Sequence, residues 1–122
     1  MAKVDDMGLN FNEASLGVWR VLTVSGELDM HTSPALQDRL DSLSGPEVAR
    51  NIAPKIAVDL SAVPFMDSSS LGVLVVSNKG LQERGGRLAL VGVDGSPKKV
   101  LSITGIDKVI PVYGSESELP QE

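Results

Sequence analysis

The sequence of 122 residues contains no cysteine and a single histidine. Without cysteine the chain has no disulfide, no thiolate metal site and no thiol nucleophile, so we expect a protein of the reducing cytoplasm. No stretch approaches the roughly twenty apolar residues that span a bilayer. Residues 1–6 also lack the apolar core of a secretory signal. These absences predict a cytoplasmic protein with no membrane partner.

Basic residues are in the minority, with 11 Lys and Arg against 16 Asp and Glu and a formal net charge of −5. Nucleic-acid binding depends largely on clustered Lys and Arg, so we expect no nucleic-acid partner and favour a protein partner. Hydrophobic residues make up 42% and charged residues 22% of the chain, both near globular averages. The length suits one domain with its own core.

Signals for catalysis are weak. A serine nucleophile normally needs a base, and His31 is expected to be an exposed loop residue, so we reject a triad of Ser68, His31 and Asp29. The carboxylates lack the dense spacing of metal ligands; they include Asp5, Asp6, Glu27, Asp29, Asp59 and Asp67. The glycine-bearing stretches 80–87 and 92–95 match neither phosphate-loop nor dinucleotide patterns. We therefore predict a protein that is not an enzyme and holds no cofactor or metal.

Periodicity and turn residues predict the element order β-β-α-β-α-β-α-β. The predicted strands are a weak stretch around 9–14 followed by 17–26 as a hairpin, then 56–60, 87–91 and 108–112. The predicted helices are 33–43, a helix that includes 71–76 and frays over 78–86, and one that opens at Ser96 with Val100, Leu101 and Thr104 inward and stops at Gly105. Residues 44–54 are interpreted as a connector, with a helical turn at 47–50 as an option.

The stretch Leu71–Val76 is ambiguous, because its β-branched residues favour a strand by propensity. It lies between two segments that resemble buried parallel strands, and such strands need a crossover connection, usually a helix. A βαβ unit accounts for all three segments. We therefore predict a helix at this position.

The segment Val58–Gly72 joins a predicted strand to that helix through an acidic, serine-rich corner. Pro64 disfavours further strand pairing, and Asp67 with the three serines that follow offers capping oxygens at the helix start. Phosphorylation of Ser68 at this junction adds roughly −1.5 to −2 charges and three acceptor oxygens. Such a change alters a protein contact without refolding the domain.

The chain resembles the STAS family, the domain shared by sulfate transporters and anti-sigma factor antagonists. The resemblance spans nearly the whole chain, and its motifs are specific in their order and separation rather than singly. The matching segments are Gly26–Asp29 followed by Thr32, Val58–Val63, Phe65–Gly72, Gly85–Leu88, and Ser96–Pro97 through Gly105–Ile106. It implies an α/β fold, a mixed sheet with an N-terminal antiparallel hairpin followed by βαβ units with helices packed on the sheet. The domain is expected over 1–113, with a flexible acidic tail at 114–122.

The resemblance also implies a function. In the soluble antagonists, the serine after the aspartate of the Asp-Ser-Ser corner is phosphorylated by the partner anti-sigma factor, a serine kinase. Here that serine is Ser68, and Asp29, Asp67, Ser68 and Ser69 are the implied partner-binding residues. The unphosphorylated protein binds the anti-sigma factor and frees a sigma factor, and a serine phosphatase resets the phosphorylated form. Ser70 stands where the family often has glycine or alanine, and the connector at 44–54 is long, so both depart from the pattern.

Two other hypotheses remain open. A STAS scaffold in a larger signalling or transporter assembly binds neighbours without releasing a sigma factor, whereas an antagonist is expected to be a monomer when free. A nucleotide-binding or nucleotide-hydrolysing enzyme is disfavoured by the missing phosphate loop. Size-exclusion chromatography distinguishes the scaffold, and ATP turnover by the isolated chain distinguishes the enzyme.

Overall fold

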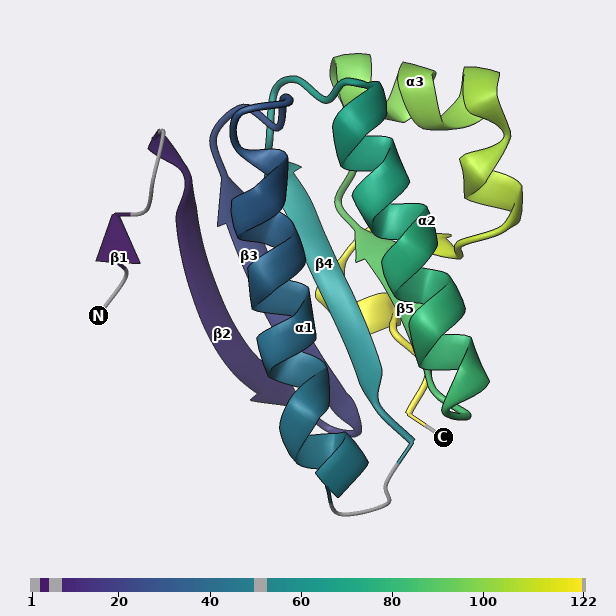
Figure 1. Ribbon diagram of the computed structural model, residues 1–122. Coiled ribbons are helices and arrows are strands. Elements are labelled where there is room, and N and C mark those ends of the chain that lie inside the picture. The colour runs from purple at the N-terminus through teal and green to yellow at the C-terminus, as the bar shows by residue number, and fades with distance from the viewer. Residues whose placement is uncertain (1–2, 5–7, 50–52, 122) are drawn as a thin grey trace.

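The computed structural model describes residues 3–4, 8–49 and 53–121, which form one sheet and three α-helices (Figure 1). The strands are β1 (Lys3–Val4), β2 (Asn10–Leu16), β3 (Trp19–Ser25), β4 (Lys55–Ala62), β5 (Arg87–Val91) and β6 (Val112–Tyr113). The helices are α1 (Ser33–Ala49), α2 (Ser68–Glu83) and α3 (Gly95–Thr104), with 3-10 turns η2 (Ile106–Lys108) and η3 (Glu116–Glu118). None of the helices in this part of the chain is long and apolar enough to cross a membrane.

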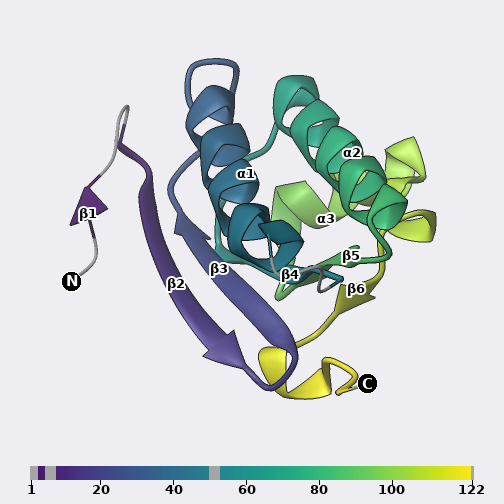
Figure 2. The same cartoon turned by 60° about the horizontal axis from the view of Figure 1, so that its bottom comes forward.

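The strands lie in the sheet in the order in which they occur in the chain. β2 and β3 pair antiparallel, with Asn10 opposite Ser25 at one end and Leu16 opposite Trp19 at the other, which confirms the predicted hairpin. β3, β4, β5 and β6 are parallel to one another. Crossovers between parallel strands are almost always right-handed, so three crossovers in the same direction along the sheet place all three helices on one face. Figure 2 shows the helices on that face and the C-terminal segment on the other.

Alternate residues of the central strands supply two separate apolar layers. The layer between the sheet and the helices includes Leu22, Ile56, Val58, Leu74 and Leu90, each fully buried. The layer on the opposite face is smaller and consists of Trp19, Val21, Ala57, Ala89, Val91 and Leu119. The helices therefore cover the larger core, and a second covering element is required on the other side.

The segment predicted as a crossover helix despite its β-branched residues is α2, which confirms the topological argument. Leu71, Leu74, Asn78 and Leu81 are buried at helical spacing and face the sheet. The amide oxygen of Asn78 accepts a hydrogen bond from the backbone N–H of Leu88 at 3.4 Å. Core contacts on one helical face thus outweigh the strand propensity of the valines.

Helix α1 continues to Ala49, so the connector predicted at 44–54 is wrong over its first six residues. Gly45 and Pro46 favour a break, because proline lacks the N–H that a helix interior uses. The earlier turns are already fixed on the core by Leu36, Leu40 and Leu43, and each added residue then extends an existing helix rather than starting one. The optional helical turn at 47–50 is part of α1 as far as Ala49, and Arg50 lies outside the described residues.

The C-terminal strand begins later than predicted. Residues 106–108 form η2, and Ile110 is buried. β6 pairs with β5 only at Val112, opposite Leu90, and at Tyr113, opposite Val91. Pro111 has no N–H to donate to the ladder, and its carbonyl accepts from Leu90 N–H at 2.9 Å. The strand predicted at 108–112 is therefore wrong in its bounds.

Helix α3 begins at Gly95, one residue before the predicted start at Ser96, and the predicted stop at Gly105, which has a left-handed φ of 78°, is confirmed. Leu101 is buried as predicted. Thr104 is exposed, however, and its hydroxyl donates back to the carbonyl of Val100 at 2.7 Å. The prediction that Thr104 points inward is wrong because the last turn of the helix lies beyond the edge of the core.

The predicted free tail at 114–122 is packed against the sheet over its described residues. Leu119 is 4% exposed within the second apolar layer. The indole N–H of Trp19 donates to the carbonyl of Pro120 at 2.7 Å, and the backbone N–H of Val18 donates to the side-chain oxygen of Gln121 at 3.0 Å. This segment covers the apolar face of the sheet that the helices leave open. The prediction of a flexible tail missed this contact because it used only the acidic, serine-rich composition of the segment.

Candidate functional site

Two loops meet at the carboxyl ends of β3 and β4, where the acidic corner lies. Leu28, in the loop before α1, forms an isolated parallel bridge with Met66, in the loop before α2. The backbone N–H of Leu28 donates to Phe65 at 2.9 Å, and that of Asp67 donates to Leu28 at 3.1 Å. Because adjacent parallel strands end at the same edge, the loops after them become neighbours. The structure thereby brings the loop that carries Asp29 beside the loop that carries Asp67.

Asp67 caps α2, as the sequence predicts. One carboxylate oxygen accepts the backbone N–H groups of Ser69 at 3.0 Å and Ser70 at 3.2 Å, and the hydroxyl of Ser69 at 2.5 Å. The hydrogen bond from the Ser69 hydroxyl has the largest effect on the pKa of Asp67 and lowers it; burial raises the pKa, and the backbone N–H groups of Ser70, Ser69 and Met30 lower it, so that the pKa is lowered overall. The carboxylate therefore remains charged well into the acid range.

A second hydroxyl group, Ser33 at the start of α1, reaches the same turn of α2. Its oxygen lies 3.0 Å from the Ser69 oxygen and 3.2 Å from the Ser70 oxygen, and it donates to the carbonyl of Asp29 at 2.6 Å. Ser70 is fully buried and Ser33 is 4% exposed. This hydroxyl network ties the first turns of the two helices together. Sequence reasoning missed Ser33 because 36 residues separate it from Ser69.

Each serine hydroxyl of this network has one proton, so it can donate only one hydrogen bond. Ser69 gives its proton to the Asp67 carboxylate, and Ser33 gives its proton to the Asp29 carbonyl, since neither acceptor has a proton to return. The proton of Ser70 is left for Ser33 at 3.2 Å or Asp67 at 3.4 Å. All three hydroxyls thus have partners within the fold, and the Ser70 proton is the one that can form a hydrogen bond between the helices, to Ser33.

Ser68 differs from its neighbours. It is the first residue of α2 and is exposed, and its hydroxyl makes no hydrogen bond to any residue in the described part of the chain. Exposure and an uncommitted proton are what a serine needs to accept a phosphoryl group from an enzyme. Among the three consecutive serines, Ser68 is the one that is exposed and whose hydroxyl has no hydrogen bond within the described residues.

Asp29 lies beside this corner in a structural arrangement. Its carboxylate accepts the backbone N–H of His31 at 2.8 Å and of Thr32 at 3.1 Å, which forms the turn that leads into α1. His31 is exposed, as expected, and Asp29 bonds its backbone rather than its ring. Within the described ranges 3–4, 8–49 and 53–121, no group of three or more His, Cys, Asp and Glu side chains is placed to hold a metal ion.

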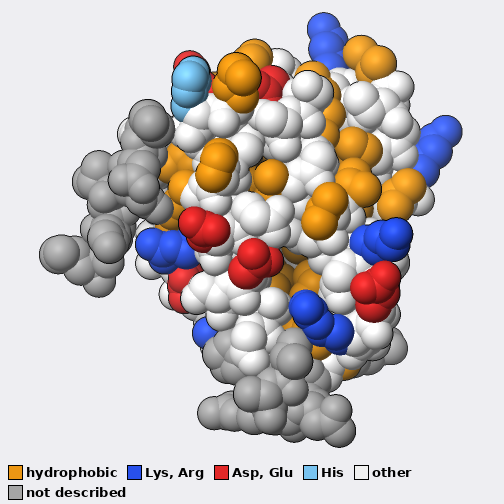
Figure 3. All heavy atoms as spheres, viewed as in Figure 1, with side chains coloured by type: hydrophobic (Ala, Val, Ile, Leu, Met, Phe, Trp, Pro, Cys, Tyr) orange, Lys and Arg blue, Asp and Glu red, His pale blue; other side chains and the backbone are white. Residues whose placement is uncertain are grey.

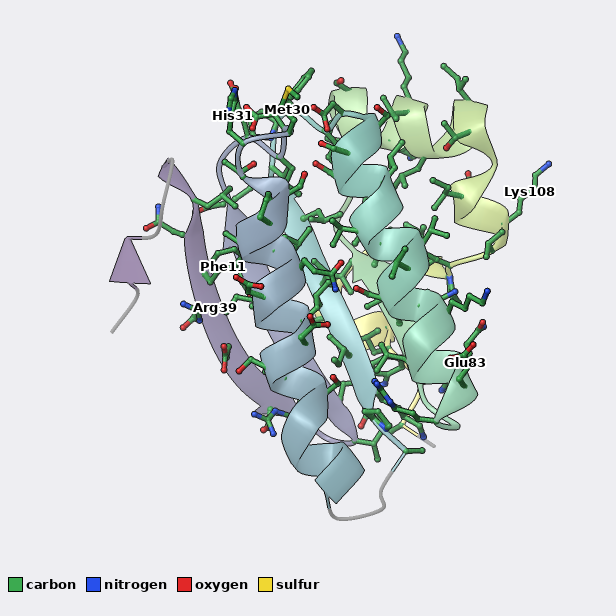
Figure 4. All side chains as sticks on the ribbon, viewed as in Figure 1. Phe11, Met30, His31, Arg39, Glu83 and Lys108 are labelled. Atoms are coloured by element: carbon green, nitrogen blue, oxygen red, sulfur yellow. The ribbon has the colours of Figure 1, made fainter. Side chains whose placement is uncertain are left out.

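Two apolar side chains at the corner are exposed, and sequence reasoning did not single them out. Met30 is 68% exposed and Phe65 is 41% exposed, on the two loops that meet at Leu28 and Met66. Figure 4 shows Met30 beside His31 at the end of the molecule where α1 begins, and Glu83 at the far end of α2. Apolar side chains also gather over α2 in the space-filling view (Figure 3). No periodic pattern in the sequence marks such loop residues.

Comparison with known proteins identifies the type of domain. The profile of the STAS domain matches residues 12–119. The chain is 32% identical over 96 residues to an anti-sigma F factor antagonist of Paenibacillus polymyxa, which covers 79% of each chain. It is 30% identical over 113 residues to an anti-sigma-B factor antagonist of Staphylococcus aureus, which covers 92% of this chain and all of the relative.

Solved structures agree with this. The crystal structure of an anti-sigma factor antagonist from Mycobacterium paratuberculosis superposes with a TM-score of 0.76 at 28% identity, covering 95% of this chain and 94% of that one. The prediction of a regulator rather than an enzyme is consistent with the names of these relatives. The matched profile spans both loops of the corner, strands β3 to β6 and all three helices, and on this evidence the chain belongs to the STAS domain family.

Proposed function

We propose that this chain is an anti-sigma factor antagonist that binds an anti-sigma factor, itself a serine kinase, and is released when that kinase phosphorylates Ser68. The observation that carries the proposal is the exposed, uncommitted hydroxyl of Ser68 next to two serines whose hydroxyls are held in the fold. In the transfer, the Ser68 oxygen attacks the γ-phosphorus of ATP, the bond to the bridging oxygen breaks, and ADP leaves. A base of the kinase takes the hydroxyl proton, and a serine phosphatase later removes the phosphate.

The surface around Ser68 suits a protein partner. Met30 and Phe65 expose apolar area next to charged and polar groups, a combination typical of interface centres and their rims. Asp29, Asp67 and Ser69, which the resemblance implies as partner-binding residues, lie on the same two loops and on the first turn of α2. In this proposal Met30 and Phe65 supply apolar contacts, and the carboxylates provide polar contacts at the edge.

Release follows from charge. Asp67 already accepts the N–H groups of Ser69 and Ser70 that a phosphate at a helix start would otherwise bind. A phosphate on Ser68 therefore adds roughly −1.5 to −2 charges beside a carboxylate whose pKa is lowered, without replacing an internal hydrogen bond. A penalty of about 1 to 3 kcal/mol at the interface weakens binding about five- to 150-fold.

Phosphate mapping tests the site. The chain is incubated with magnesium ATP and the anti-sigma factor kinase of its own organism, and the labelled serine is located by mass spectrometry. We expect label on Ser68 in the parent, in Ser69→Ala and in Ser70→Ala, and no label in Ser68→Ala. Label confined to Ser69 or Ser70 would contradict the assignment.

Binding measurements test the switch. Ser68→Ala should bind the anti-sigma factor like the parent and stay bound in the presence of ATP. Ser68→Asp, which carries less charge than phosphate, should bind more weakly than the parent but more tightly than the phosphorylated chain. Size-exclusion chromatography of the free chain should give a monomer; a stable assembly unaffected by phosphorylation would favour the scaffold hypothesis instead.

A further inference from the structure

Gly72 lies one turn after Ser68 in the interior of α2, where glycine is unfavourable because it makes a helix less stable than alanine does. Glycines in proteins are often required by a positive φ or by a close neighbour. Gly72 has neither reason. Its φ is not in the positive range, and a Cβ built on it meets no atom within 4 Å. The fold therefore tolerates a side chain at this position.

The helix geometry places Gly72 on the same face as Ser68. Four residues advance a helix by about 6 Å and turn it by about 40° from the starting direction. Val75 lies one turn beyond Gly72 on the same face, about 20° from Ser68 in the direction opposite to Gly72, and is 40% exposed. Next to Ser68, the exposed face of α2 thus has a position with no side chain, followed by the exposed apolar side chains of Val75 and Val76.

A kinase that phosphorylates Ser68 must cover this face. Phosphoryl transfer needs the serine oxygen within about 3 to 3.5 Å of the γ-phosphorus, so the kinase surface contacts the atoms around Ser68. A typical interface buries about 800 Å² on each partner, which corresponds to a radius of about 16 Å. Gly72, about 6 Å along the helix, lies well inside such an area.

We propose that Gly72 is a docking notch for the anti-sigma factor serine kinase, at which the missing side chain lets the kinase surface approach the backbone of α2. This inference rests on the proposed function and adds a specificity-determining position to it. The kinase is the occupant because it is the partner that must reach Ser68, and Val75 provides apolar contact beyond the notch. A methyl group at position 72 holds the two surfaces apart and weakens docking.

Gly80 provides a matched control on the same helix. It is also a helical glycine at which a Cβ meets no atom within 4 Å. It lies about 18 Å along the axis from Ser68 and about 120° around it, beyond the expected contact area. It lines the groove between α1 and α2 together with Leu40 and Leu81. Alanine at either glycine therefore makes the same chemical change, but only one change lies in the proposed contact.

Thermal unfolding without a partner is the first measurement. Gly72→Ala and Gly80→Ala should each raise Tm by about 2 to 5 °C, because alanine is the better helix former. A Tm of Gly72→Ala below that of the parent would show that the fold requires this glycine, and it would overturn the inference without any partner.

Phosphorylation kinetics are the second measurement, with magnesium ATP and the anti-sigma factor kinase of the same organism. Gly72→Ala should raise the KM for the chain about tenfold and leave kcat within about twofold, and Gly80→Ala should match the parent. A parental KM for Gly72→Ala overturns the notch and leaves the proposed function standing. Absence of label on Ser68 in the parent overturns the proposed function, and the notch with it.

Discussion

Replacing Asp67 by alanine should destabilise the domain by removing the cap of α2. The carboxylate accepts two backbone N–H groups, of Ser69 and Ser70, and the hydroxyl of Ser69. Loss of such a cap costs about 0.5 to 2 kcal/mol, and the additional hydroxyl contact places the expected value in the upper half of that range. In a domain of this size we expect Tm to fall by about 3 to 8 °C.

Asp94 offers a control for this substitution. It holds the N-cap position of α3 with the same extended backbone as Asp67, but its side chain makes no capping hydrogen bond. Asp94→Ala should therefore change Tm by less than about 2 °C. Asp67→Asn keeps an acceptor oxygen and loses only the charge, so its effect should fall between those of Asp67→Ala and Asp94→Ala.

The pH dependence separates the charge from the hydrogen bonds. Since the pKa of Asp67 is lowered in the folded state, the stability due to its charge is present above the unfolded pKa and is lost as the pH falls through the folded pKa. The Tm difference between the parent and Asp67→Asn, measured by circular dichroism, should therefore become smaller as the pH is lowered from 7 to below the folded pKa of Asp67. Equal Tm values for Asp67→Ala and Asp94→Ala at pH 7 would refute the capping argument.

Two further predictions concern the segment that covers the second apolar layer. Leu119→Ala should cost about 2 to 3 kcal/mol in chemical unfolding and alter the fluorescence of Trp19, the only tryptophan, whereas a free tail predicts no change in either. A hydrogen bond with Asp59 raises the pKa of Glu116, and burial and the charge of Asp59 raise it further. The stability that protonated Glu116 contributes is therefore present below the unfolded pKa of Glu116 and is lost as the pH rises through its folded pKa. Glu116→Gln should therefore raise Tm at pH 7 and leave it unchanged near pH 4, and an equal change at both values would count against this pairing.

Short-range patterns were sufficient for much of the fold. The capping residue Asp67 predicted where α2 begins, and the terminating Gly105 predicted where α3 ends. The short apolar run at 87–91 predicted β5 as a buried strand. Caps, left-handed turns and apolar runs depend on residues close in the chain. The acidic corner was likewise predicted at the junction of β4 and α2. The sequence by itself therefore determined the order of elements and the position of Ser68 at a helix start.

Only the tertiary structure decided which of the serines is available. Ser33 is brought to Ser69 and Ser70 by the pairing of β3 with β4, and its contact with them leaves Ser68 as the serine whose hydroxyl is uncommitted. The docking of Leu119 and the continuation of α1 through Pro46 also depend on packing. Contacts between residues 36 to 101 positions apart are set by how the layers assemble, and no local propensity encodes them.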